Sequence, residues 1–175
     1  FYVFIVHSLG ARAPFLNLKL LTDRNYAIGL ALVTIYGMLN FTPMVLLPPL
    51  LQQHVGFSDA LVGQVIGCRG LGMLLGFMAA GFMSRIDPRI SMAFGFGLQT
   101  AAGLWMLTFD LNVTMEILVI NSAIQGFAVG VVWVPITVVA FDTLDAKDYA
   151  EASSIFHLLR NIGSSFFISL SIAEI

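Results

Sequence analysis

The sequence predicts an all-α membrane protein, a polytopic bundle of hydrophobic helices. Hydrophobic residues make up 58% of the 175-residue chain and charged residues only 10%, whereas soluble domains carry about 25% charged residues. The mean hydropathy is +0.92. The apolar residues gather into long runs separated by short polar segments, and such runs are long enough to cross a bilayer as helices. Too few charged residues remain to cover a water-soluble surface.

Two segments precede the long runs. Residues 1–9 are apolar, but no basic stretch precedes them and no small-residue cleavage site follows. They are therefore predicted to be the tail of a preceding transmembrane helix, not a signal peptide. Residues 10–25 are mixed and basic and are predicted to form a cytoplasmic loop. Because residues 162–175 are also apolar to the last position, we expect both ends of the chain to cut through helices.

Five transmembrane helices are predicted over residues 26–175. The first contains Pro43, and Pro48 and Pro49 are expected to end it, because proline lacks the amide N–H that continues a helix. The short connections require neighbouring helices to be antiparallel. The approximate ranges are 26–51, 60–83, 90–109, 117–141 and 152–175.

The basic residues of the loops predict the orientation. The loops at 52–59 and 110–116 contain no Lys or Arg. Cytoplasmic loops of membrane proteins carry an excess of these residues, so the loops at 10–25, 84–89 and 142–151 are predicted to face the cytoplasm. Their basic residues are Arg12, Lys19, Arg24, Arg85, Arg89 and Lys147.

Two further arginines, Arg69 and Arg160, lie inside predicted spans. A charge at the centre of a membrane helix costs about 2.5–3.5 kcal/mol on insertion scales, so such residues normally face the bundle interior or an aqueous cavity. Gly72 and Gly76 follow Arg69 by three and seven residues, which places small residues on its face of the helix. We expect both arginines to organise polar contacts inside the bundle.

Other polar residues also lie within the spans. Ser153, His157, Arg160 and Ser164 share one helix face by their spacing. Such residues could line a substrate cavity or join helices by hydrogen bonds, and the sequence leaves both open. His157 has the same two readings, as a proton carrier or a hydrogen-bonding partner. The candidate cavity residues are Tyr36, Asn40, Gln99, Asn121, Gln125 and His157.

Glycine spacing predicts close helix packing. Small residues four positions apart allow two helix backbones to approach each other. This pattern occurs three times inside predicted spans, at Gly63/Gly67, Gly72/Gly76 and Gly126/Gly130.

Several functional classes lack the residues they need. One cysteine, Cys68, excludes an internal disulfide and a four-cysteine zinc site. A net charge of −2 gives no reason to expect a nucleic-acid partner. The chain has no phosphate-binding loop, zinc-ligand cluster or nucleophile-elbow motif, so we predict neither an enzyme nor a metal protein.

Three stretches, taken in order, resemble the C-terminal half of the fourteen-helix drug/proton antiporter branch of the major facilitator superfamily, the EmrB/QacA-like multidrug efflux permeases. The resemblance covers nearly the whole chain. The stretches are residues 14–21 with Asp23-Arg24-Asn25-Tyr26; Cys68-Arg69-Gly70-Leu71-Gly72 through Gly81-Phe82-Met83-Ser84-Arg85-Ile86-Asp87-Pro88-Arg89; and Gln125–Gly130 with Val134-Pro135, followed by Glu151–Ser154 and Leu159–Ser164.

The resemblance implies the end of an extra helix followed by core helices seven to eleven of a major facilitator fold, in a multi-pass protein of the bacterial inner membrane. It implies a proton-driven exporter of hydrophobic or amphipathic compounds that works by alternating access, needs no cofactor, and uses the proton gradient as its energy source. The gating motif of the family corresponds to Arg85, Asp87 and Arg89. The implied partners are the lipid bilayer, the small-molecule substrates and an N-terminal half; whether a periplasmic adaptor protein docks is left open.

The family's proton-coupling carboxylates lie mainly in the N-terminal half, and no Asp or Glu lies well inside a complete span of this chain. Two departures from the family pattern stand out. Ser84 occupies a position that is often acidic, and residues 165–168 replace a stretch that is often glycine-rich. The alternatives are an uptake or narrow-substrate carrier of the same superfamily, and a non-transporting membrane protein or inactive gene fragment.

Overall fold

The computed structural model describes residues 18–83, 87–109 and 113–173, and these ranges contain helices and no β-strand. The prediction of an all-α helix bundle is therefore confirmed. The expected helix tail at residues 1–9 and most of the loop at 10–25 lie outside the described residues. The elements are η1 (Leu18–Thr22), α2 (Arg24–Leu50), η2 (Leu51–Val55), α3 (Asp59–Met83), α4 (Pro88–Met106), α5 (Met115–Phe141), η3 (Ala146–Asp148) and α6 (Tyr149–Ala173).

The five long helices begin slightly before the apolar runs that predicted them, because their first turns are polar. Asp23 precedes α2 in extended conformation, and its carboxylate accepts a hydrogen bond from the amide of Tyr26. Asp87 caps α4 in the same way through the amide of Arg89, and Pro88 occupies the first turn. A polar capping residue satisfies free amides at a helix start, so Asp23 and Asp87 allow α2 and α4 to begin before their apolar runs.

The first helix was expected to end at Pro48 and Pro49, near residue 51, and the α-helix does end just after them, although one helical turn of another kind follows. The α-helix continues to Leu50 and is followed by a π-helical turn, η2. The chain turns instead at Gly56, which has a φ of 76°, a conformation that favours glycine. The amides of Gly56 and Phe57 both donate to the carbonyl oxygen of Leu51. The helix therefore ends where its last carbonyls find donors.

Four helical segments are long and apolar enough to cross a membrane, by length and composition. The helix α4, with 19 residues, is not among them; its sequence contains Gln99, Thr100 and several glycines. The chain is a multi-pass membrane protein. The four segments are Arg24–Gln53, Asp59–Met83, Met115–Phe141 and Ala146–Ala173.

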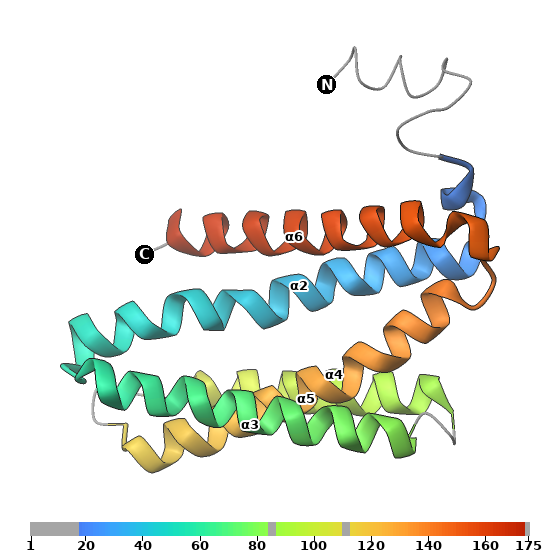
Figure 1. Cartoon of the computed structure of the whole chain (residues 1–175). Coiled ribbons are helices and arrows are strands. Elements are labelled where there is room, and N and C mark those ends of the chain that lie inside the picture. Colours follow the sequence, from blue (N-terminus) through green and yellow to red (C-terminus); the bar gives the residue numbers. More distant parts are fainter. Residues whose placement is uncertain (1–17, 84–86, 110–112, 174–175) are drawn as a thin grey trace.

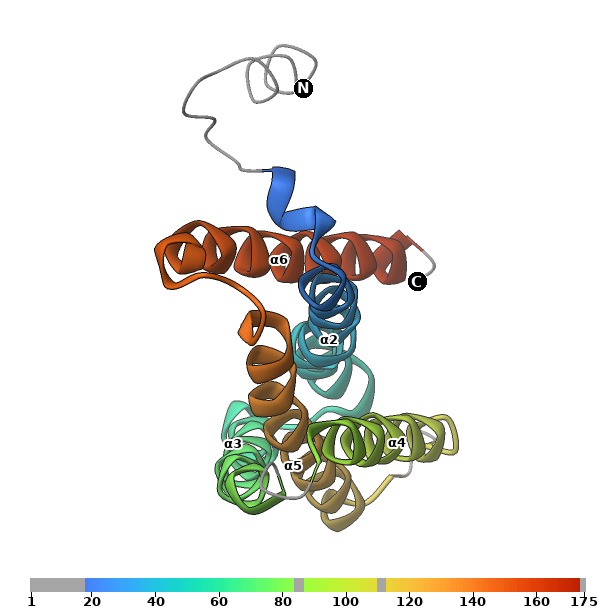
Figure 2. The same cartoon turned by 90° about the vertical axis from the view of Figure 1, so that its right-hand side faces the viewer.

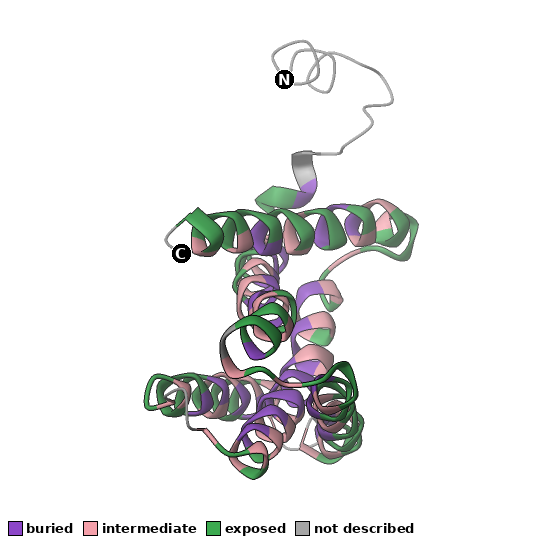
Figure 3. Ribbon diagram, turned by 90° about the vertical axis from the view of Figure 1, so that its left-hand side faces the viewer, coloured by how far each residue is buried: buried purple, intermediate pink, exposed green. Residues whose placement is uncertain are grey.

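The helix α5 lies at the centre of the bundle. It contacts α3, α4 and α2, whereas α6 packs mainly against α2. Figure 2 shows α3 and α4 on either side of α5, with the α2–α6 pair beyond them. Burial follows this arrangement, since buried positions concentrate along α5 and the inner face of α2 while the outer faces are exposed (Figure 3).

The starts of α2, α4 and α6 lie at one end of the bundle, on the right in Figure 1. The described parts of the three predicted cytoplasmic loops, residues 18–25, 87–89 and 142–151, therefore lie at this end, as alternating antiparallel helices require. Two hydrogen bonds join the start of α2 to the turn after α5 and to the start of α6 at this end. The Thr143 hydroxyl donates to Asp23 Oδ1 at 2.8 Å, and the Tyr26 hydroxyl donates to the carbonyl oxygen of Ala152 at 2.7 Å.

Candidate functional site: intramembrane arginines

Glycines bring α3 and α5 into backbone contact beside Arg69. A Cβ atom at Gly126 would overlap the carbonyl oxygen of Arg69, and a Cβ at Gly72 would overlap the carbonyl oxygen of Ala123. The pairs Gly72/Gly76 and Gly126/Gly130 both face this contact, as their spacing predicts. By contrast, no described atom lies within 4 Å of a Cβ placed at Gly63 or Gly67. The close approach fixes the position of Arg69 relative to α5.

The Arg69 guanidinium joins three helices. Its Nη1 donates to Gln125 Oε1 on α5 at 2.7 Å. Its Nη2 donates to the side-chain and main-chain oxygens of Asn40 on α2, both at 3.0 Å. All of these acceptors are uncharged. The guanidinium is therefore hydrogen-bonded, but no carboxylate in the described part of the chain neutralises its positive charge.

The same hydrogen bonds continue to α4. Gln125 Nε2 donates to Asn121 Oδ1 at 2.7 Å, and Asn121 Nδ2 donates to the carbonyl oxygen of Ala102 at 2.9 Å. Asn121 is 2% exposed and Gln125 3%. We call Asn40, Arg69, Gln125 and Asn121 the Arg69 network. The interhelical hydrogen bonds foreseen as one alternative are thus present, and a cavity-lining role for Asn40, Asn121 and Gln125 remains a prediction.

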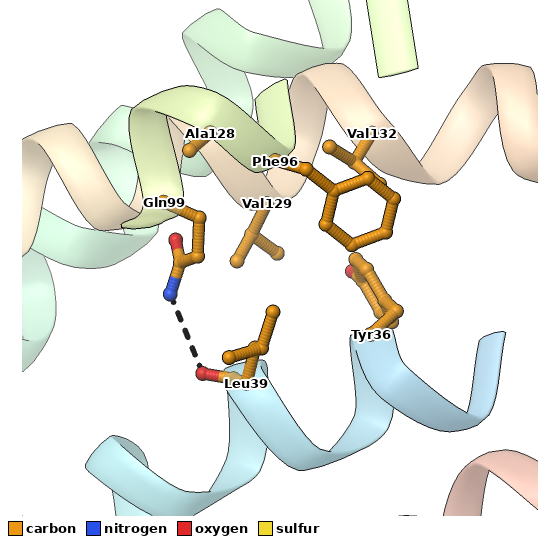
Figure 4. A pocket seen from close by; sticks show the side chains of 7 residues that line it. All are labelled: Tyr36, Leu39, Phe96, Gln99, Ala128, Val129 and Val132. Carbon is orange, nitrogen blue, oxygen red and sulfur yellow. Dashed lines mark hydrogen bonds between the residues drawn. The ribbon is translucent and has the colours of Figure 1, made fainter. Parts of the chain in front are cut away.

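Tyr36 and Gln99 lie beside a small internal pocket between α2, α4 and α5 (Figure 4). The volume open to the centre of a water molecule is about 10 Å³, which is near the minimum that one water requires. Gln99 Nε2 donates to the carbonyl oxygen of Leu39 at 3.4 Å, while its buried Oε1 has no hydrogen-bond partner among the described residues. This pocket is too small for a drug-sized substrate.

Arg160 has different surroundings from Arg69. Its Cζ atom lies 5.7 Å from the ring centre of Phe41 on α2 and 5.5 Å from that of Trp133 on α5. We call these two rings the aromatic pair. Its Nη2 makes one long hydrogen bond, 3.4 Å, to Asn161 of the next position, and its buried Nε has no partner among the described residues. Aromatic faces attract the cation but offer it no hydrogen-bond acceptor.

His157 lies one turn before Arg160 and is exposed. Its ring stacks on Trp133 with a centroid distance of 6.1 Å and an interplanar angle of 30°. Tyr36 contacts the same indole from α2, at 5.1 Å between ring centroids. His157 therefore belongs to the surroundings of Arg160 and not to the Arg69 network. Its role as a proton carrier or as a hydrogen-bonding partner remains open.

The predicted gating loop is only partly within the described residues. Arg85 lies outside them. Asp87 caps α4, its Oδ1 accepting from the amide of Arg89 at 2.8 Å, while Arg89 is exposed. The carboxylate thus has a local structural role, and a gating role for Arg85, Asp87 and Arg89 remains a prediction.

The sequence interpretation did not include the aromatic pair. Tryptophan is enriched at membrane interfaces, so Trp133, well inside α5, was a signal that could have identified it. Phe41 is one of 15 phenylalanines and carries no comparable signal. Its position over Arg160 depends on how α2 packs against α6, which local sequence does not specify.

Several known proteins are similar to this chain in sequence. The chain is 27% identical to the probable multidrug resistance protein EmrY of Escherichia coli K12 and 28% identical to the multidrug export protein EmrB of the same strain. Each alignment covers 95% of this chain and 33% of the relative. It is 26% identical to the fatty acid resistance protein FarB of Neisseria gonorrhoeae, over 90% of this chain and 31% of that protein. The chain thus spans about a third of the length of these relatives.

The sequence profile described as Major Facilitator Superfamily matches residues 29–173. This range contains the five long helices almost completely, together with both intramembrane arginines. Since the match covers well over half of the residues, the chain belongs to the Major Facilitator Superfamily.

Proposed function

We propose that this chain supplies five helices to a proton-driven exporter of hydrophobic or amphipathic compounds in a bacterial inner membrane. The superfamily assignment and the similarity to proteins named for multidrug export, multidrug resistance and fatty acid resistance support the proposal. The transporter would use the proton gradient without a cofactor. Its partners would be the bilayer, the small-molecule substrates, the remaining helices of the transporter and, as an open point, a periplasmic adaptor.

The observation that carries this proposal is the Arg69 network. Alternating access in such transporters is largely a rocking of one helix bundle against another around a central site. A bundle that rocks as a unit needs its helices joined within the membrane, and Arg69 connects α2, α3 and α5 directly. Hydrogen bonds through Gln125 and Asn121 add α4.

The test uses the full-length transporter that contains this chain, expressed in a bacterial strain lacking its own efflux pumps. Cells are loaded with a fluorescent hydrophobic dye, and efflux is followed with and without a protonophore. We expect protonophore-sensitive efflux, most of which is lost in Arg69→Ala and partly retained in Arg69→Lys. Arg24→Ala is the matched control, because Arg24 is exposed at the start of α2.

Two results would overturn the proposal. One is the absence of gradient-dependent efflux across a broad panel of compounds in cells whose membranes contain the folded protein. The other is counterflow in inverted and right-side-out vesicles that shows uptake of a single compound class, which would instead identify a carrier of narrow specificity.

A further inference from the structure

The charges inside the helices are unbalanced. Arg69 and Arg160 both lie within the spans, whereas the acids of the described helices, Asp59, Glu116 and Glu151, lie in first turns. Among the described residues, neither arginine forms an ion pair. A permanent cation is stable within a membrane only when it is paired, hydrogen-bonded or hydrated. The two arginines meet this requirement to very different degrees.

Arg69 has its acceptors within the bundle, because Gln125 and Asn40 receive its donors at 2.7 and 3.0 Å. Arg160 lacks them. One long contact to Asn161 and a buried Nε without a partner leave most of its donors unused. The chain therefore provides a completed site for one arginine and an incomplete site for the other.

The groups facing Arg160 show what is missing. The guanidinium carbon lies over the two rings of the aromatic pair, Phe41 and Trp133, whose faces attract the cation but accept no N–H···O hydrogen bond from its donors. The titratable groups around it are His157 on α6 and Tyr36 on α2. An imidazole is neutral or positive and a phenol is neutral at neutral pH, so neither side chain supplies a negative charge. A carboxylate has the planar two-oxygen geometry that matches a guanidinium edge.

We propose that Arg160 forms an ion pair with a carboxylate on a membrane-spanning helix of the transporter outside residues 1–175. Charge complementarity supports this partner, since the spans described here carry arginines and no acid beyond their first turns. About two thirds of the length of the relatives has no counterpart in this chain, so further helices are available to supply it. The inference rests on the proposed function only in assuming a larger transporter.

The test uses a carbodiimide, a reagent that modifies protonated carboxyl groups in apolar surroundings. The purified full-length protein is labelled in detergent, and modified acids are located by mass spectrometry. In the wild type, the paired carboxylate stays ionised and unlabelled. In Arg160→Gln we expect one additional labelled Asp or Glu within a membrane helix outside this chain, whereas Arg160→Lys keeps the charge and the protection.

Two matched controls separate this effect from general opening of the fold. Arg24→Gln removes an exposed arginine, and Arg69→Gln removes an arginine whose partners are neutral. Neither variant should therefore cause labelling of the carboxyl group that pairs with Arg160. If Arg160→Gln is not monodisperse on size-exclusion chromatography, Arg160→Met replaces it, since methionine keeps an apolar stem against the aromatic pair. A charge swap combines Arg160→Glu with replacement of the labelled acid by Arg. The carboxylate introduced at position 160 should then be paired and protected from the carbodiimide.

The proposal is overturned if no acid gains label in Arg160→Gln or Arg160→Met, or if the same acid gains it in Arg24→Gln. A different result would also overturn it: Arg160→Gln and Arg160→Met lose the binding of carboxylate-bearing amphiphiles while no acid of the protein gains label. The carboxylate that pairs with Arg160 would then belong to a substrate. Labelling needs no transport, so a failure of efflux and a failure of pairing are distinguishable.

Discussion

Arg69 Nη1 donates a 2.7 Å hydrogen bond to Gln125 Oε1, which joins α3 to α5 inside the membrane. The contact is short because the backbones of the two helices touch at Gly126 and Gly72. A glutamine supplies an acceptor without a compensating charge. The bundle thus keeps the positive charge of Arg69 while satisfying its donors, and the packing of α3 against α5 depends on a polar contact as well as on apolar area.

Replacing Gln125 with leucine should destabilise the protein. Gln125→Leu removes an acceptor of Arg69 and the donor to Asn121; we expect a loss of about 1.5–3 kcal/mol, the usual range for hydrogen bonds to charged groups. The measurement is thermal unfolding of the purified full-length protein in detergent. Gln52→Leu is the control, because Gln52 is exposed and its bond to Asp59 lies at the surface. Equal melting temperatures for both variants would contradict the prediction.

The sequence predicted the helices better than their contacts. Apolar run length located all five long helices, and glycine spacing indicated the faces that α3 and α5 bring together at Gly72 and Gly126. The same spacing at Gly63 and Gly67 has no packing partner among the described residues. A spacing pattern marks a face on which a helix can be approached closely, but it does not say which helix does so.

The candidate site shows the same limit. The free-energy cost of a charge inside a membrane helix identified Arg69 and Arg160 as candidate functional residues. Their partners, Asn40 and the aromatic pair, are far away in sequence. These contacts depend on the rotation and register of α2, which no local pattern specifies. The end of α2 at Leu50 lies close to the predicted end near residue 51, but the π-helical turn that follows and the chain reversal at Gly56, with its positive φ, were not foreseen.

Adding one methyl group at the α3–α5 contact should be costly. In Gly126→Ala the new Cβ would overlap the carbonyl oxygen of Arg69, a backbone atom that cannot move without shifting the helix. Overpacking of this kind costs about 1–3 kcal/mol. Gly103→Ala on α4 is the matched control, since no described atom lies within 4 Å of its Cβ position. The melting temperatures of the two variants are compared. If Gly126→Ala left the melting temperature unchanged, the close approach of α3 and α5 would be contradicted.

The cap of α2 should contribute stability in a pH-dependent way. Hydrogen bonds from the Tyr26 amide, and then from the Thr143 hydroxyl, lower the pKa of the Asp23 carboxyl from its ordinary value of 3.8. A lowered folded-state pKa gives stability that is present above pH 3.8 and lost as the pH falls through the lower value. Asp23→Ala should therefore cost about 1 kcal/mol at pH 7, as for other N-caps.

Melting curves at pH 7 and at progressively lower pH test this expectation. The difference between wild type and Asp23→Asn, which keeps a capping oxygen but cannot ionise, should shrink below pH 3.8 as Asp23 becomes protonated. A difference that stays constant with pH would mean that ionisation of Asp23 contributes nothing. Thr143→Val gives an independent check, because it removes only the hydroxyl donor to Asp23, which lies in the turn after α5.

Removing the Tyr26 hydroxyl should loosen α6 from α2. The ring of Tyr26 is fully buried, and its hydroxyl donates to the carbonyl oxygen of Ala152 at 2.7 Å; loss of a typical hydrogen bond costs about 1 kcal/mol. Tyr149→Phe is the matched control, since Tyr149 is exposed while its ring contacts Phe141 edge to face. We expect Tyr26→Phe to lower the melting temperature and to speed amide hydrogen exchange in the first turns of α6. If Tyr149→Phe had an equal or larger effect, the loss would not be specific to the hydrogen bond between Tyr26 and Ala152, and the prediction would be wrong.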